Sequence, residues 1–182
     1  KERYREDYVR VWRTLLANAK VSGFAGLPDA ARKVKALGSN PSPLIQLINA
    51  VSFNTAVDSI WASTIFQPAL TVSPADTIKV ISEASAPWLK AVQALGTALD
   101  AVAAASPTDR EAPAQQAKGL VTEAKNAAAA MSISFAGGTT SVGPDISRLL
   151  NSGFSSIDGM LGNVGVAGTN KSGADFCRDY GR

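Results

Sequence analysis

The sequence predicts an all-α protein, a helical bundle of about seven helices with a long central helical hairpin. Three observations lead to this fold class. Alanine is very frequent and runs of β-branched residues are short, which favours helix over sheet. Apolar residues recur at three- and four-residue steps along most of the 182-residue chain. They make up 46% of the residues, enough for a packed core.

The first expected helix carries an apolar stripe near the N-terminus. Charged residues of both signs surround the stripe, and we interpret them as a solvated face with ion pairs one turn apart, in preference to an anion-binding patch. Gly23 and Gly26 end this helix. The stripe consists of Tyr4, Tyr8, Val11, Trp12, Leu15 and Ala19.

A short second helix is expected over residues 28–37. Asp29 lies in its first turn and basic residues lie later, which matches the helix dipole. Gly38 suits the position just past the end of the helix.

The sharpest helix start lies in the stretch NPSPLIQLINAVSFNT, residues 40–55. Pro41 and Pro43 cannot continue a helix, but Pro43 fits the first helical position. Ser42 is placed to cap the exposed amides of the first turn. The prolines therefore set where the third helix begins and at what angle the chain enters it. Its apolar stripe consists of Leu44, Leu47, Ile48 and Val51.

Residues 59–72 have no steady periodicity and contain Trp61 and Pro68, so we expect a packed connection with a short strand-like piece. The sequence Ser-Pro-Ala-Asp from Ser73 then predicts a short helix to about Ser82. We place a boundary here, with an N-terminal helical subdomain at 1–72. Residues 73–182 then hold the long hairpin and the C-terminal helices, in one compact or two-part domain.

The central hairpin is expected from two long apolar stripes, over residues 87–105 and 114–134. Small residues dominate the second stripe, which lets the two helices approach closely. The polar loop between them contains a candidate capping box at Thr108 and Glu111. The first stripe is too short to span a membrane and contains Asp100.

The C-terminal part begins with a glycine-rich loop at 137–143, which lacks the Gly-Lys-Ser/Thr ending of a P-loop. Pro144 and the following aspartate open another helix, whose apolar residues continue past Gly153. The glycine-rich stretch 159–168 is expected to end it in a mobile connection.

A last short helix is expected over residues 171–179, with Phe176 and Cys177 facing inward. Cys177 is the only cysteine. It could be a thiol with a lowered pKa, but a half-buried structural cysteine is the favoured interpretation.

The residue inventory argues against an enzyme. Histidine is absent, which removes the commonest general base and metal ligand. A single cysteine allows no cysteine-based metal site, and no Ser-x-x-Lys or Gly-x-Ser-x-Gly motif occurs. The net charge of +3 is too small to indicate nucleic acid. We therefore expect no catalytic residues, no cofactor, no metal and no small-molecule substrate.

The three tryptophans, Trp12, Trp61 and Trp88, are the remaining candidates for contacts. They are most simply core or groove anchors, and an exposed one would favour a partner-binding patch instead.

Several of these pieces, in this order, resemble the IcmF/TssM family, the inner-membrane core subunit of bacterial type VI secretion. The Ser42-Pro43-Leu44 stretch with Asn54 and Thr55 is the most specific of them. The likeness is to the helical segment of the periplasmic region that precedes the C-terminal β-sandwich. The other pieces are the opening Tyr4, Tyr8, Trp12 and Leu15, then Pro87-Trp88-Leu89, and the tail with Asn170, Phe176 and Cys177.

The resemblance implies a structural, non-enzymatic segment of a membrane complex, in the periplasmic portion of an inner-membrane protein. The chain begins at Lys1, so we expect it to be part of a larger, membrane-anchored protein. The implied partners are other subunits of the secretion complex, including further copies, and an outer-membrane lipoprotein reached through a following domain. The alternatives are a helical interaction adaptor unrelated to secretion, and an enzyme with an unrecognised acid or Ser/Lys site.

Overall fold

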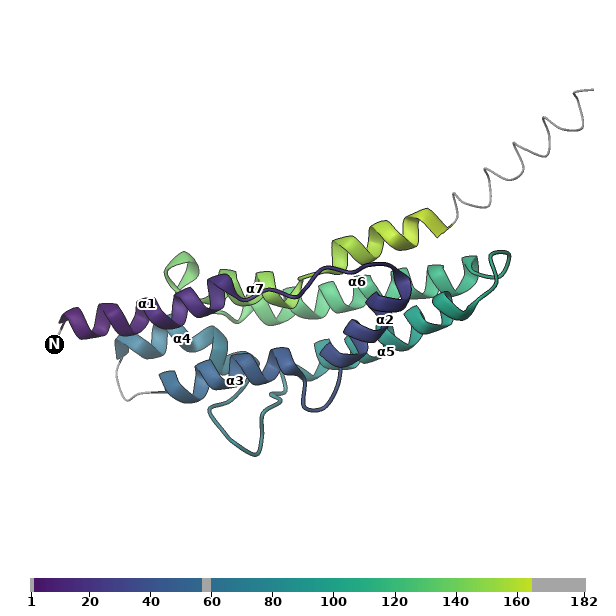
Figure 1. The fold of residues 1–182 in the computed structure, drawn as a ribbon. Coiled ribbons are helices and arrows are strands. Elements are labelled where there is room, and N and C mark those ends of the chain that lie inside the picture. Colours follow the sequence, from purple (N-terminus) through teal and green to yellow (C-terminus); the bar gives the residue numbers. More distant parts are fainter. Residues whose placement is uncertain (1, 57–59, 165–182) are drawn as a thin grey trace, which may run out of the picture.

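The computed structural model describes residues 2–56 and 60–164, apart from the side chains of residues 2, 4, 60, 61 and 63. The described residues are helical with no strand, as the sequence predicts. The helices run roughly along one direction, so the molecule is elongated (Figure 1). In chain order the elements are α1 Glu2–Asn18, α2 Leu27–Leu37, α3 Pro43–Thr55, α4 Ile60–Val72, α5 Ala86–Ala104, α6 Glu111–Ile133, the 3-10 helix η1 Gly138–Thr140 and α7 Gly143–Leu150, followed by further helical residues at 154–164.

The predicted hairpin of α5 and α6 is confirmed, and the two helices lie side by side along half of the molecule (Figure 1). Small side chains on the buried face of α6 allow the close approach. The buried face consists of Ala114, Ala117, Val121, Ala124, Ala128 and Met131.

The predicted capping box at the start of α6 is wrong. Arg110 occupies the N-cap position and makes no side-chain cap hydrogen bond. The hydroxyl of Thr108 lies 2.9 Å from that of Ser106 instead. Pro113 is tolerated in the first turn, where its missing N–H would have no intrahelical partner. The helix therefore begins before Pro113, earlier than predicted.

Two glycines allow α2 to pack closely on α5. Gly38, just after α2, faces α5, and Gly96, on α5, faces α2. A β-carbon added at Gly38 would lie 2.9 Å from the backbone nitrogen of Gln93, and one added at Gly96 would lie 3.1 Å from that of Lys35. Gly38 does follow the end of α2, but its φ of −83° is open to any residue. Glycine is therefore required at this position because the two helices approach closely, and not because the backbone is left-handed.

α3 starts as the proline pattern predicts. Pro43 is the first helical residue, and the buried hydroxyl of Ser42 accepts the N–H of Ile45 at 3.5 Å. Leu47, at the edge of the predicted stripe, is only half-buried. The face of α3 that enters the core consists of Leu44, Ile45, Ile48, Val51, Ser52 and Thr55.

The predicted connection over residues 59–72 is wrong, because α4 is a helix with Pro68 inside it. Pro68 has no N–H to donate to the carbonyl four residues earlier. A distant loop packs against this turn, and the backbone N–H of Val142 donates to the carbonyl of Ile65 at 3.0 Å. This hydrogen bond ties α4 to a distant loop at the turn that contains Pro68.

The short helix predicted from Ser73 to Ser82 is also wrong, and this segment is an irregular loop. Serine and aspartate side chains form the hydrogen bonds that a helix would have formed with its own backbone. The hydroxyl of Ser73 donates to the carbonyl of Val80 at 2.5 Å, and that of Ser82 to the carbonyl of Val72 at 2.9 Å.

α1 buries only part of the predicted stripe, because Trp12 and Ala19 pack against the core while other members are exposed. Leu16 is its fully buried residue and lies outside that stripe. Val11 and Leu15, which belong to the stripe, are 61% and 41% exposed. Polar groups hold α1 in place, since the guanidinium of Arg148 donates to the carbonyls of Leu16, Ala17 and Ala19 at the end of α1.

After α7, the chain turns at Gly153, whose φ of 89° is left-handed. The ring of Phe24 occupies the space that a side chain there would need, 2.7 Å from an added β-carbon. The prediction that glycines end the next helix from residue 159 is wrong for the described part, because residues 154–164 are helical and include Gly159 and Gly162. A buried stripe outweighs the cost of about 1 kcal/mol for each glycine. That stripe consists of Phe154, Ile157 and Leu161.

One hydrophobic core joins residues from both sides of the predicted boundary at residue 72. The division into 1–72 and 73–182 stays a prediction. The predicted helix at 171–179 lies outside the described residues.

Candidate interaction surface

An apolar groove of about 350 Å³ lies beside the start of α3, and we call it the α2/α3 groove. Three residues of the predicted helix start and its apolar stripe, Pro43, Leu44 and Leu47, meet there. The other lining residues come from the connector after α1, from α2 and from α7. They are Ala19, Lys20, Val21, Ser22, Lys33, Ala36, Leu37 and Leu149.

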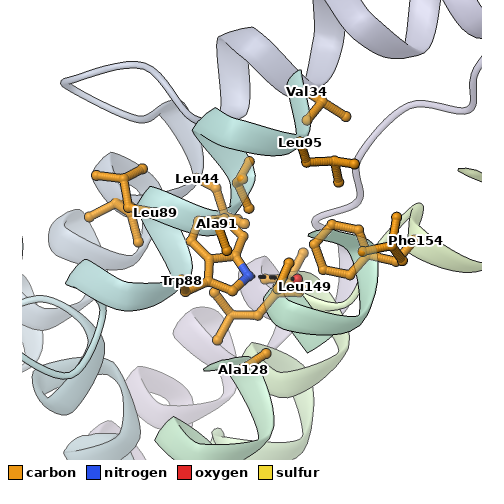
Figure 2. Packing of buried hydrophobic residues seen from close by; sticks show 14 of the residues in the cluster. Val34, Leu44, Trp88, Leu89, Ala91, Leu95, Ala128, Leu149 and Phe154 are labelled. Atoms are coloured by element: carbon orange, nitrogen blue, oxygen red, sulfur yellow. Dashed lines mark hydrogen bonds between the residues drawn. The ribbon is translucent and has the colours of Figure 1, made fainter. Parts of the chain in front are cut away.

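Trp88, another predicted candidate, lies in the core and not on this surface. It is almost fully buried on α5, and its indole N–H donates to the carbonyl of Leu150 at 3.2 Å. Figure 2 shows its ring beside Leu149, with the hydrogen bond from the indole nitrogen drawn as a dashed line. Trp88 therefore links the hairpin to the last turn of α7.

Trp12 is half-buried on α1 and packs edge-to-face with Tyr8, with ring centroids 6.5 Å apart. The hydroxyl of Tyr8 donates to the carbonyl of Asn54 on α3. This aromatic pair thus joins α1 to the C-terminal end of α3. The side chain of Trp61 lies outside the described part, and so do Phe176 and Cys177.

A projecting loop at residues 73–85, which we call the Ile78 loop, is the second surface feature (Figure 1). Ile78 is 92% exposed. The side-chain amide of Asn49 donates to the carbonyls of Pro74 and Asp76, at 2.7 Å and 3.1 Å. The loop is therefore fixed to α3 while the side chain of Ile78 points into solvent.

Two carboxylates near these surfaces have pKa values below their usual range. Lys33, the backbone N–H of Ala25 and Arg32 lower the pKa of Asp29. The backbone N–H groups of Ile78 and Lys79 lower the pKa of Asp76, because they donate to its carboxylate. Both groups are ionised at neutral pH.

Because the pKa values of Asp29 and Asp76 are lowered, we expect the protein to lose stability at acid pH. A carboxylate whose pKa is lower in the folded state than in the unfolded state stabilises the fold at pH values above its unfolded-state pKa. This stabilisation is lost as the pH falls through the folded-state pKa. The melting temperature should therefore drop as pH falls from about 5 to about 2. We expect a smaller drop for an Asp29→Asn/Asp76→Asn variant, measured by circular dichroism. An equal drop in this variant would contradict the assignment. Glu123→Gln, an exposed carboxylate on α6, is the matched control.

A second groove of about 510 Å³ runs between α1 and α4. Val9 and Ile65 contribute apolar surface, and Arg5, Arg10 and Arg13 contribute charge. Arg10 pairs with Asp7 at 2.5 Å, and Arg13 donates to the backbone carbonyls of Thr140 and Ser141. The exposed Arg10–Asp7 pair agrees with the interpretation of the charges on α1 as a solvated face, whereas Arg13 contacts a distant loop.

Neither groove gathers the residues of a metal centre. Among the described residues, no group of three or more Cys, Asp or Glu side chains is placed to hold a metal ion. No helix among the described residues is both long enough and apolar enough to cross a membrane.

Sequence reasoning missed the Ile78 loop and the groove residues outside α3. Asn49 and Asp76 carried a signal, because both residue types favour hydrogen-bonded turns. Val21, Leu37 and Leu149 carried none, since each is an ordinary apolar residue whose place in the groove depends on tertiary packing.

Within residues 2–56 and 60–164, the fold and these surfaces define a helical protein with apolar grooves and an ordered projecting loop. A family model described as "IcmF-related: Intracellular multiplication and human macrophage-killing" matches residues 1–56. These residues are therefore an IcmF/TssM-family region, and they span α1 to the end of α3. All the residues of the α2/α3 groove except Leu149 belong to it. The family suggests a component of a secretion system and is membrane-associated. Searches of curated proteins and of solved structures found no match to the chain.

Proposed function

We propose that this chain is a structural segment of the type VI secretion membrane complex. In this role it is a periplasmic helical spacer without enzymatic activity. It extends from the membrane-anchored part of its parent protein toward the outer-membrane lipoprotein, which a following domain contacts. Its own contacts are with other subunits of the complex, including further copies of the parent protein.

The IcmF-related match over residues 1–56 is the observation that carries this proposal. The matched region contains the Ser-Pro-Leu helix start, and that start both caps α3 and lines the α2/α3 groove. A stretch with both roles suits a scaffold, because it sets a helix angle and offers an apolar surface. The elongated arrangement of the helices supports a spacer (Figure 1).

Cysteine labelling in intact cells tests the periplasmic placement. The full-length parent protein would carry Cys177→Ser, to remove the one cysteine of this chain, and Gly119→Cys as a reporter. Gly119 is exposed on α6, and a β-carbon added there meets no atom within 4 Å. We expect a membrane-impermeant maleimide to label it once the outer membrane is permeabilised. The parent with Cys177→Ser alone controls for labelling elsewhere. Labelling only after lysis of the inner membrane would overturn the placement and favour the adaptor alternative.

The secretion role has its own test. Deleting the parent gene should abolish export of type VI effectors into the medium, and the full-length gene should restore it. Undiminished export in the deletion strain would contradict the role, whatever the labelling shows.

A further inference from the structure

We propose that the α2/α3 groove receives the Ile78 loop of a second copy of this chain. The side chain of Ile78 is the inserted group, and the groove beside the start of α3 is its receptor. The inference deepens the proposed scaffold role and rests on it, since it names the surfaces through which copies would meet.

The shape of the Ile78 loop favours insertion. Hydrogen bonds from Asn49 and Ser73, and to the carboxylate of Asp76, hold the loop in one conformation. Binding through it therefore costs little ordering entropy. Ile133 is also very exposed, at 86%, but it lies on the surface of α6. A residue at a loop tip can enter a groove, whereas one on a helix surface can only cover it.

The α2/α3 groove has the complementary character. Its lining is mostly aliphatic, and its volume of about 350 Å³ has room for an isoleucine side chain. Ile78 does not fill it within the same chain, because Ile78 is exposed and its loop borders a different cavity. That cavity also contains Asn40, Ser42 and Ile45.

One pair of charges across the two surfaces is complementary, although the exposed Lys79 on the loop has the same sign as the groove lysines. Asp76 precedes Ile78 by two residues and is exposed, and hydrogen bonds to its carboxylate keep it ionised. Lys20 is exposed at the groove rim. The second rim lysine, Lys33, already pairs with Asp29 at 2.7 Å. Lys20 is therefore the group that can meet Asp76 of another copy.

The contact is small, so the isolated chain should associate weakly. Anchoring many copies in one membrane raises their effective concentration and makes a weak contact sufficient. Disrupting the insertion of one isoleucine should weaken association roughly ten- to a hundredfold.

Sedimentation equilibrium of the 182-residue chain tests the contact. We expect reversible association of the wild type, and weakened association for Ile78→Ser, which removes the inserted group. Val21→Asp should weaken it as well, because it places a carboxylate in the groove. Ile133→Ser is the matched control and should associate as the wild type does. Thermal melting of each variant checks that the fold is kept.

Mixing the two weakened variants gives the decisive result. The chain with Ile78→Ser keeps its groove and the chain with Val21→Asp keeps its loop, so an equimolar mixture should form a one-to-one dimer. A wild type that stays monomeric up to on the order of 1 mM overturns the inference. A mixture that fails to dimerise also overturns it. The same holds if Ile133→Ser weakens association as much as Ile78→Ser does. These outcomes leave the secretion and labelling tests untouched, so a failed contact and a failed scaffold role can be distinguished.

Discussion

Replacing Trp88 with alanine is expected to destabilise the protein by about 4 kcal/mol or more. Truncating a buried tryptophan costs about 3–5 kcal/mol through lost apolar contacts and the cavity left behind. The carbonyl of Leu150 also loses the indole N–H, and an unsatisfied buried acceptor costs about 1–3 kcal/mol. A typical domain has about 5–15 kcal/mol of total stability, so this one substitution removes a large share of it.

The position of the carbonyl explains why this hydrogen bond matters. Leu150 is the last residue of α7, where carbonyl groups have no amide of the same helix to accept. The indole N–H of Trp88 therefore completes the end of α7 from a different helix. Trp88 thus both fills the core between the elements and closes a helix terminus.

Urea denaturation followed by circular dichroism measures the loss, with Trp88→Phe as the companion variant. Phenylalanine keeps an aromatic ring but has no N–H, so it should cost less than alanine yet more than about 1 kcal/mol. If Trp88→Phe matched the wild type, the hydrogen bond to Leu150 would contribute nothing. If Trp88→Ala cost less than about 2 kcal/mol, the core position would be wrong.

The sequence predicted the elements whose signals are local. The hairpin of α5 and α6 has long apolar stripes, and the start of α3 has a serine and two prolines in capping positions. Such signals lie within the element that they specify, so they predict it correctly where no distant contact opposes them.

The errors occurred where distant residues decide the structure. Pro68 indicated a break, but α4 continues through it, and a hydrogen bond from Val142 ties this turn to a distant loop. The serine, proline and aspartate after α4 matched a helix start, yet Asn49 on α3 holds them in a loop. Neither Val142 nor Asn49 is near in sequence to the segment that it stabilises. Local patterns could not have revealed these contacts.

The sequence indicated some residues of the candidate surface but not the surface itself. Pro43, Leu44 and Leu47 were chosen for their place in a helix start, and they do line a groove. Trp88 was considered as a groove anchor as well as a core residue, and it lies in the core. Composition shows that an aromatic residue will pack, but only the tertiary structure shows which face it packs on.

The crossing of α2 and α5 gives the second large effect. Replacing Gly96 with valine is expected to cost about 3 kcal/mol, the upper end of the range for overpacking. A β-carbon there would lie 2.8 Å from Cγ of Lys35, 3.1 Å from its backbone nitrogen and 3.2 Å from its Cα. Rotating a side chain cannot relieve contacts with the backbone, so α2 must move away from α5.

Gly38 makes the reciprocal contact with Gln93, so the two glycines should be coupled. Once Gly96→Val has displaced α2, an added side chain at Gly38 meets less resistance. The Gly38→Ala/Gly96→Val double variant should therefore lose less stability than the sum of the two single losses.

Gly119→Ala is the control, and it should stabilise the exposed helix by about 0.5–1 kcal/mol because nothing opposes its β-carbon. Urea midpoints of the four variants give the comparison. Strict additivity at Gly38 and Gly96, or a stabilising Gly96→Val, would show that the two helices do not meet through their backbones.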